Sequence, residues 1–138
     1  RCKAGPLMNL GDVSAQVVPK MSLVAPPKAG GSVCTRTFIP HVCHSTIGVL
    51  GAVTVATACV LPGTVGARVA MIPDGRRKRL SVEHPTGEFS VELEVGGTAD
   101  APKVERAALL RTARPLFEGS ILIPARVWVG MTATADAA

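Results

Sequence analysis

The chain has 138 residues, of which 47% are hydrophobic and only 3% aromatic, and its formal net charge is +5. This length suffices for one domain with its own core. The high hydrophobic content excludes a disordered chain, and the scarcity of aromatic residues predicts a core of Val, Ala, Leu and Ile.

The first forty residues predict the end of a helix followed by two strands. Residues 1–10 fit the last turns of a helix that stops near Gly11. Residues 16–25 predict a strand, and Pro19 confines its first part to a sheet edge or a bend. Residues 32–39 alternate in polarity and are rich in β-forming residues, which predicts a second strand.

Residues 45–61 are the most informative segment, because they form an almost uncharged run that predicts one helix. Ser45 and Thr46 are good N-cap residues, and Pro62 with Gly63 is a stop signal. Apolar side chains point in every direction around such a helix, so we expect it to be buried on all sides. Its free N–H groups, the hydroxyls and His44 predict an anion site at the N-terminus.

Beyond Gly63 the pattern changes to strands, which we expect at residues 64–72, 79–83, 87–95, 103–110 and 120–129. Residues 131–138 are expected to form a frayed tail. The whole pattern predicts a single α+β domain over residues 1–138. In it, a mostly antiparallel, barrel-like sheet of six or seven strands is wrapped around one central buried helix.

Two classes of partner are not expected. The basic run of residues 76–79 follows Asp74 and Gly75, a pair that favours a hairpin turn. Nucleic-acid binding is an alternative for this run, but no aromatic platform accompanies it, so we expect a solvated loop. The apolar helix is at the lower length limit for a bilayer span and contains glycines and threonines, so no membrane association is expected.

The cysteines favour a reduced, cytoplasmic protein without a disulfide framework. Cys2, Cys34, Cys43 and Cys59 form no CxxC pair, and no signal peptide is visible at the start. Cys59 lies in the apolar helix and is expected to be a core residue. A metal site with Cys43 and its flanking histidines is the alternative, but the spacing fits no standard zinc pattern, so no metal is expected.

Seven groups of residues follow one another along the chain at positions 3–5, 9–14, 18–21, 36–41 with 44 and 51–52, 62–64, 83–87, and 111–114 with 118–119. Together and in this order they resemble the PrpF-type isomerases, the group that includes 2-methylaconitate isomerase and 4-oxalomesaconate tautomerase. The resemblance covers nearly the whole chain.

The resemblance implies the diaminopimelate-epimerase-like fold, in which two similar domains each wrap a sheet around a central helix and the active site faces both helix N-termini. It implies that this chain is the C-terminal half, without the first-half cysteine and lysine of the family, so the catalytic residues are unknown. Cys43 is not assigned their role. Leu50 replaces the threonine that the family usually has before this Gly-Ala pair, and Thr54 stands where the family often has a cysteine.

The reaction of this family moves a double bond in a di- or tricarboxylic acid by proton transfer without a cofactor. The resemblance and the helix N-terminus together assign substrate binding to six residues: Arg36, His44, Ser45, Thr46, Gly51 and Ala52. His44 can also exchange protons, and its alternative role is a capping or packing histidine. The alternative for Arg36 is an exposed strand arginine.

Two functional classes follow. One is the carboxylate-binding half of an isomerase or tautomerase, which forms a homo-oligomer or pairs with a complementary N-terminal half and is inactive alone. The other is a non-catalytic stand-alone module that binds an anion or a partner chain. His41, His84, Arg111 and Arg114 are expected to be structural in either class.

Overall fold

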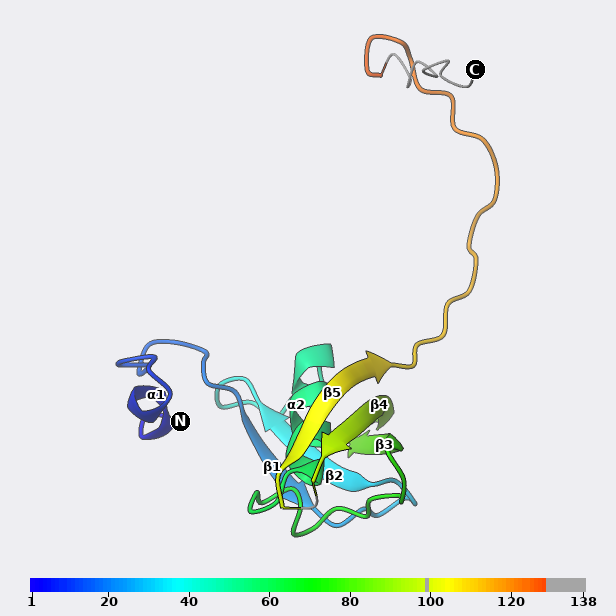
Figure 1. Cartoon of the computed structure of the whole chain (residues 1–138). Coiled ribbons are helices and arrows are strands. Elements are labelled where there is room, and N and C mark those ends of the chain that lie inside the picture. The colour runs from blue at the N-terminus through cyan, green and yellow to red at the C-terminus, as the bar shows by residue number, and fades with distance from the viewer. Residues whose placement is uncertain (99, 129–138) are drawn as a thin grey trace, which may run out of the picture.

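The computed structural model describes residues 1–98 and 100–128. The elements are α1 (Ala4–Leu7), β1 (Met21–Ala25), β2 (Val33–Phe38), α2 (Val49–Val60), β3 (Arg77–His84), β4 (Gly87–Gly97) and β5 (Pro102–Leu109). Figure 1 shows α2 packed against a twisted sheet, α1 to one side, and an extended arm that leaves the end of β5. The expected tail at residues 131–138 lies outside the described residues.

The five strands form one sheet in the order β1-β2-β3-β4-β5. Strand β2 pairs with β3 in parallel, and the other three pairings are antiparallel. The predicted mixed α+β architecture with a mostly antiparallel sheet is therefore confirmed. The sheet is open in the part of the chain that the structure describes, so the barrel-like closure and the count of six or seven strands are not found there.

Residues 64–72 form turns instead of the predicted strand. The Thr64 hydroxyl donates to the carbonyl oxygens of Ala58 and Leu61 and so closes the end of α2. Gly66 packs directly on the backbone at Ala58 and Cys59, where an added Cβ would lie 3.1 Å from main-chain atoms. Side-chain capping and this close approach turn the segment under the helix, although its composition favours a strand. The predicted strand at residues 120–129 is also absent over its described part.

Helix α2 buries one face only. Ala52, Val55, Ala56 and Cys59 pack on a core that comes from β2, β3 and β4. On the opposite face the Leu50 side chain is 82% exposed. The expectation of burial on all sides is therefore wrong for the described residues, because strands cover only one side of the helix.

The core role predicted for Cys59 is confirmed. Its side chain is 2% exposed, and burial raises the pKa of the thiol to about 11. Desolvation disfavours the thiolate, so this cysteine behaves as a small apolar residue.

The basic run lies at the start of β3 instead of in a solvated hairpin loop. Arg77 and Arg79 pair with Glu94 and Glu92 of the neighbouring β4, with N–O distances of 3.0 Å. Arg76 pairs with Glu105. Asp74 and Gly75 lie in a bend, with Gly75 at a φ of +87°, but no strand leads directly into them, so the predicted hairpin is wrong; the hairpin forms between the end of β3 at His84 and the start of β4 at Gly87. Cross-strand pairs of opposite charge support this register of β3 and β4.

No helix among the described residues is both long enough and apolar enough to cross a membrane.

Candidate functional site

The pre-helix loop, residues 39–48, connects β2 to α2. It folds back on the strand it leaves, because Phe38 forms a β-bridge with Cys43 and the backbone N–H of His44 donates to Thr37 O at 2.8 Å. Ile47 is buried in the core and fixes the other end of the loop. His44 is thereby held close to the end of β2.

His44, Ser45 and Thr46 form a compact exposed turn within this loop. The backbone N–H of Thr46 donates to Nδ1 of His44 at 3.1 Å, and the Thr46 hydroxyl lies at the same distance. Because Nδ1 accepts a backbone hydrogen bond, the neutral imidazole carries its proton on Nε2. Nε2 has no hydrogen-bond partner in residues 1–98 and 100–128, so it can donate to a ligand.

Helix α2 starts at Val49, four residues later than the sequence predicts. Gly48 is its N-cap, in an extended conformation and without a side-chain hydrogen bond, so Ser45 and Thr46 do not cap the helix. The first intrahelical bond runs from the Ala52 N–H to Gly48 O at 2.9 Å. The N–H groups before it have no acceptor inside the helix.

The two helical residues predicted to bind substrate therefore differ in what they offer. Gly51 lies in the first turn and supplies one of the free N–H groups. Ala52 is fully buried, and its N–H is used in the bond to Gly48. Ala52 thus supports the first turn from the core side.

The turn between β3 and β4 joins this region to the rest of the sheet. The Thr86 hydroxyl donates to Ser45 O at 2.9 Å, a contact between residues 41 positions apart. His84 begins the turn, and the backbone N–H of Thr86 donates to its Nδ1 at 3.4 Å. The β3–β4 turn therefore fixes the position of the pre-helix loop.

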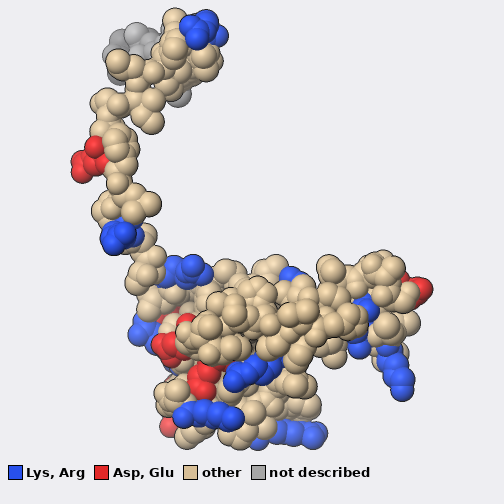
Figure 2. Space-filling model, turned by 180° about the vertical axis from the view of Figure 1, so that it is seen from behind, with Lys and Arg blue, Asp and Glu red and all other residues tan. Residues whose placement is uncertain are grey.

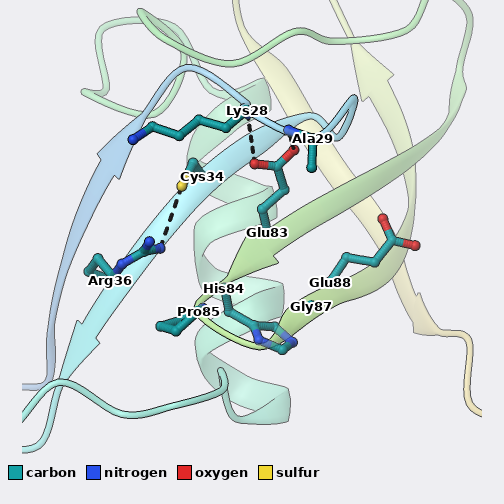
Figure 3. Close-up of a pocket in the computed structure, with 9 residues that line it drawn as sticks. All are labelled: Lys28, Ala29, Cys34, Arg36, Glu83, His84, Pro85, Gly87 and Glu88. Atoms are coloured by element: carbon teal, nitrogen blue, oxygen red, sulfur yellow. Dashed lines mark hydrogen bonds between the residues drawn. The ribbon is translucent and has the colours of Figure 1, made fainter.

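A cavity of about 420 Å³ lies beside this turn, on the face of the sheet opposite α2 (Figure 3). Strands β2 and β3 pair at only two positions, Val33 with Val82 and Cys34 with Glu83, and then separate. Val33 and Val82 pack toward α2, so Cys34 and Glu83 point to the opposite face. The lining residues are Lys28, Ala29, Cys34, Arg36, Glu83, His84, Pro85, Gly87 and Glu88.

Arg36 belongs to this cavity, separate from the residues around His44. Its Nη1 donates to Thr35 O at 2.7 Å and lies 3.6 Å from the sulfur of Cys34. His41 lies in a third place, a hollow that it shares with Met21 and Phe38 among others. The predicted site residues thus divide into a cluster of His44, Ser45, Thr46 and Gly51, and the isolated Arg36.

Glu83 closes one wall of the cavity. Its buried carboxylate accepts the backbone N–H groups of Lys28 at 2.8 Å, Ala29 at 2.8 Å and Gly31 at 2.9 Å. The hydrogen bond from Lys28 makes the largest contribution to lowering the pKa of this carboxyl group below its ordinary value. The carboxylate holds the β1–β2 loop against the end of β3.

Sequence reasoning assigned no role to Lys28 and Cys34, and it placed Glu83 and Thr86 only within a motif. The glycine-rich loop after Pro26 and Pro27 could have indicated this arrangement, because exposed backbone N–H groups in such loops bind carboxylates. In the described ranges, no three His, Cys, Asp or Glu side chains are grouped so that they could hold a metal ion.

Comparison with known proteins gives consistent results. The sequence model of a family described as PrpF protein matches residues 1–124. The chain is 61% identical over 123 residues to the (4E)-oxalomesaconate Delta-isomerase of Novosphingobium sp. (strain KA1), covering 89% of this chain and 34% of that protein. It is 50% identical over 130 residues to the 4-oxalomesaconate tautomerase of Pseudomonas putida, and this match covers 94% of this chain and 35% of that protein.

A solved structure, that of methylitaconate-delta-isomerase, superimposes with a TM-score of 0.66 at 22% identity, over 86% of this chain and 34% of that one. This likeness supports the same fold. The chain spans about a third of the length of the curated relatives it matches.

Proposed function

The chain belongs to the PrpF family, and on that premise we propose that it is the carboxylate-binding part of a cofactor-independent isomerase that moves a double bond in a di- or tricarboxylic acid. The observation that carries the proposal is the 61% identity to a relative named as an oxalomesaconate isomerase. The unpaired N–H groups and the free Nε2 of His44 at the start of α2 support it, because they offer donors to a carboxylate.

The proposed roles follow from the donors that each residue offers. Ser45, Thr46 and the N–H of Gly51 bind one substrate carboxylate where the helix dipole favours negative charge. Ala52 keeps this first turn packed against the core. Arg36 binds a second carboxylate from its own cavity.

The proposed reaction needs no oxidant or reductant. A base removes a proton from the carbon next to the conjugated system, the electron pair moves the double bond by one position, and an acid returns a proton at the far carbon. The donors at the start of α2 stabilise the negative charge that develops. His44 can deliver or accept one proton at Nε2.

We further propose that the complete enzyme has a complementary part that covers this chain, and that this chain alone is inactive. Support comes from the arm, defined as residues 110–128. Every residue of the arm is exposed, Leu122 by 94%, and most of it is uncharged in Figure 2. The family model matches residues 1–124, which include residues 110–124 of the arm.

A chimera tests this function. This chain replaces the matching third of the Novosphingobium isomerase, and ultraviolet absorbance follows the conversion of oxalomesaconate. We expect the chimera to be active and the isolated chain to be silent. In the chimera, the triple variant His44→Ala, Ser45→Ala, Thr46→Val should lose most activity, while the matched exposed variant Thr98→Val should not.

Equal activity of the triple variant and Thr98→Val would exclude the start of α2 as the substrate site. Turnover by the isolated chain as a monomer would overturn the need for a complementary part. Light scattering on the isolated chain supplies the oligomeric state for that comparison.

A further inference from the structure

We propose that the cavity between β2 and β3 binds a small carboxylate or phosphate anion between Arg36 and Lys28. The argument starts from how the acidic groups of the cavity are used. Both oxygens of Glu83 accept backbone N–H groups of the β1–β2 loop. Glu88 accepts the hydroxyl of Ser81. The acidic side chains that line the cavity are therefore engaged elsewhere.

The two cations of the cavity form no close ion pair in the described ranges, although the charge of Lys28 contributes to lowering the pKa of Glu83. No ion pair within residues 1–98 and 100–128 includes Lys28 or Arg36. In contrast, Arg77 and Arg79 of β3 and Arg106 of β5 each lie within 4.0 Å of a glutamate oxygen. Arg36 is thus a sheet arginine without the carboxylate partner that these three arginines have.

The orientation of Arg36 is already fixed. Its Nη1 is held by Thr35 O, which leaves Nε and Nη2 without a protein partner in the described ranges. Figure 3 shows Cys34 between Lys28 and Arg36, with Glu83 turned to the loop and Glu88 directed away from them. A guanidinium whose remaining N–H groups are free matches the two oxygens of a carboxylate or phosphate.

The cavity is large enough for such a ligand. Its volume of about 420 Å³ falls within the range of roughly 300–1,000 Å³ that is usual for small-molecule sites. Lys28 adds a second positive charge at the rim, where its exposed side chain can move to meet the anion. A substrate carboxylate is one source of this anion, an assignment that rests on the proposed function, and inorganic phosphate is the other.

Calorimetric titration of the 138-residue chain with citrate and with inorganic phosphate tests the proposal. We expect binding of at least one probe, weakened about tenfold or more by Arg36→Gln and less by Lys28→Gln, since a charge-assisted hydrogen bond is lost in the first case. Arg36→Lys should bind with intermediate affinity. Arg106→Gln, on the same sheet but outside the cavity, is the matched control, and thermal melting checks that each variant folds.

The proposal would be overturned if Arg36→Gln and Arg106→Gln bound the probes with equal affinity, or if neither citrate nor phosphate bound to the chain. Binding that survives the triple variant at residues 44–46 supports a site separate from the start of α2. In the chimera, a raised KM for Arg36→Gln assigns the anion to the substrate, while an unchanged KM with lost phosphate binding assigns it to phosphate. An inactive chimera whose cavity still binds the probes would refute the proposed function and leave the anion site standing.

Discussion

Replacing Glu83 with alanine should be among the most destabilising single changes on the polar face of the sheet. The change removes the acceptor of three backbone hydrogen bonds, at 2.8, 2.8 and 2.9 Å, that hold the β1–β2 loop. Each hydrogen bond to a charged group is worth about 1.5–3 kcal/mol, and an unpaired buried group costs a similar amount. Water from the adjacent cavity can reach part of the loop, so we expect a total loss of about 3–5 kcal/mol.

Glu83→Gln is the informative companion variant. One amide oxygen can still accept the N–H groups of Ala29 and Gly31, but an amide NH₂ would face the N–H of Lys28. Its loss of stability should therefore lie between those of the wild type and Glu83→Ala. Glu92→Gln, which breaks an exposed pair with Arg79, should cost less than about 1 kcal/mol.

The pH dependence provides a second readout. The pKa of Glu83 is lowered in the folded state relative to the ordinary value of 4.5. Its contribution to stability is therefore fully present above pH 4.5 and is lost as the pH falls through the lower, folded-state pKa. Glu83→Gln should lack this part of the acid transition.

Urea unfolding followed by circular dichroism measures these differences, because the signal of the sheet does not depend on the single tryptophan in the arm. If Glu83→Ala and Glu92→Gln unfold at the same urea concentration, the three hydrogen bonds do not hold the loop, and the reasoning about this wall of the cavity fails.

Three further predictions concern the helix, the cysteines and the arm. Ala56→Asp should prevent folding because it buries an unpaired carboxylate, whereas Thr54→Asp on the exposed face of α2 should fold; equal melting temperatures would contradict the described packing. Cys43 should react with a thiol reagent in the native chain while Cys59 reacts only after unfolding, since Cys43 is exposed and Cys59 is buried; fast labelling of both would contradict the core. Trypsin should cut residues 110–128 in the isolated chain and spare them in the chimera, and equal cleavage would show that nothing covers the arm.

The sequence predicted strand β4 well, but it did not predict the turns that follow α2. Strand β4 could be found because Phe89, Val91, Leu93 and Val95 alternate with polar residues over a long run, and the described strand extends only two residues further. Residues 64–72 have a similar β-forming composition, yet hydrogen bonds from the Thr64 hydroxyl to the end of α2 turn them. These bonds join residues only six and three positions apart, so the missed signal was a local one, a hydroxyl placed to cap the end of the helix.

The candidate site was predictable in its residue types and only partly in its arrangement. The cap preference of Ser45 and Thr46 placed the helix start too early, because these residues form a turn in which the Thr46 N–H donates to Nδ1 of His44, and Gly48 is the N-cap. The place of Arg36 depends on strand register, since the next residue along β2 faces the other side of the sheet. The position of Lys28 beside the cavity depends on how the β1–β2 loop folds, which the sequence pattern does not predict.

The end of β2 connects the two groups of residues for which we propose anion binding. Arg36 lines the cavity, and the backbone carbonyl oxygen of the next residue, Thr37, accepts the N–H of His44. The bond from the Thr86 hydroxyl to Ser45 O ties the β3–β4 turn to the same loop. Both proposed carboxylate contacts are thus attached to one rigid frame, which is what a substrate with two or more carboxylates requires, because the separation between its binding groups must not change during proton transfer.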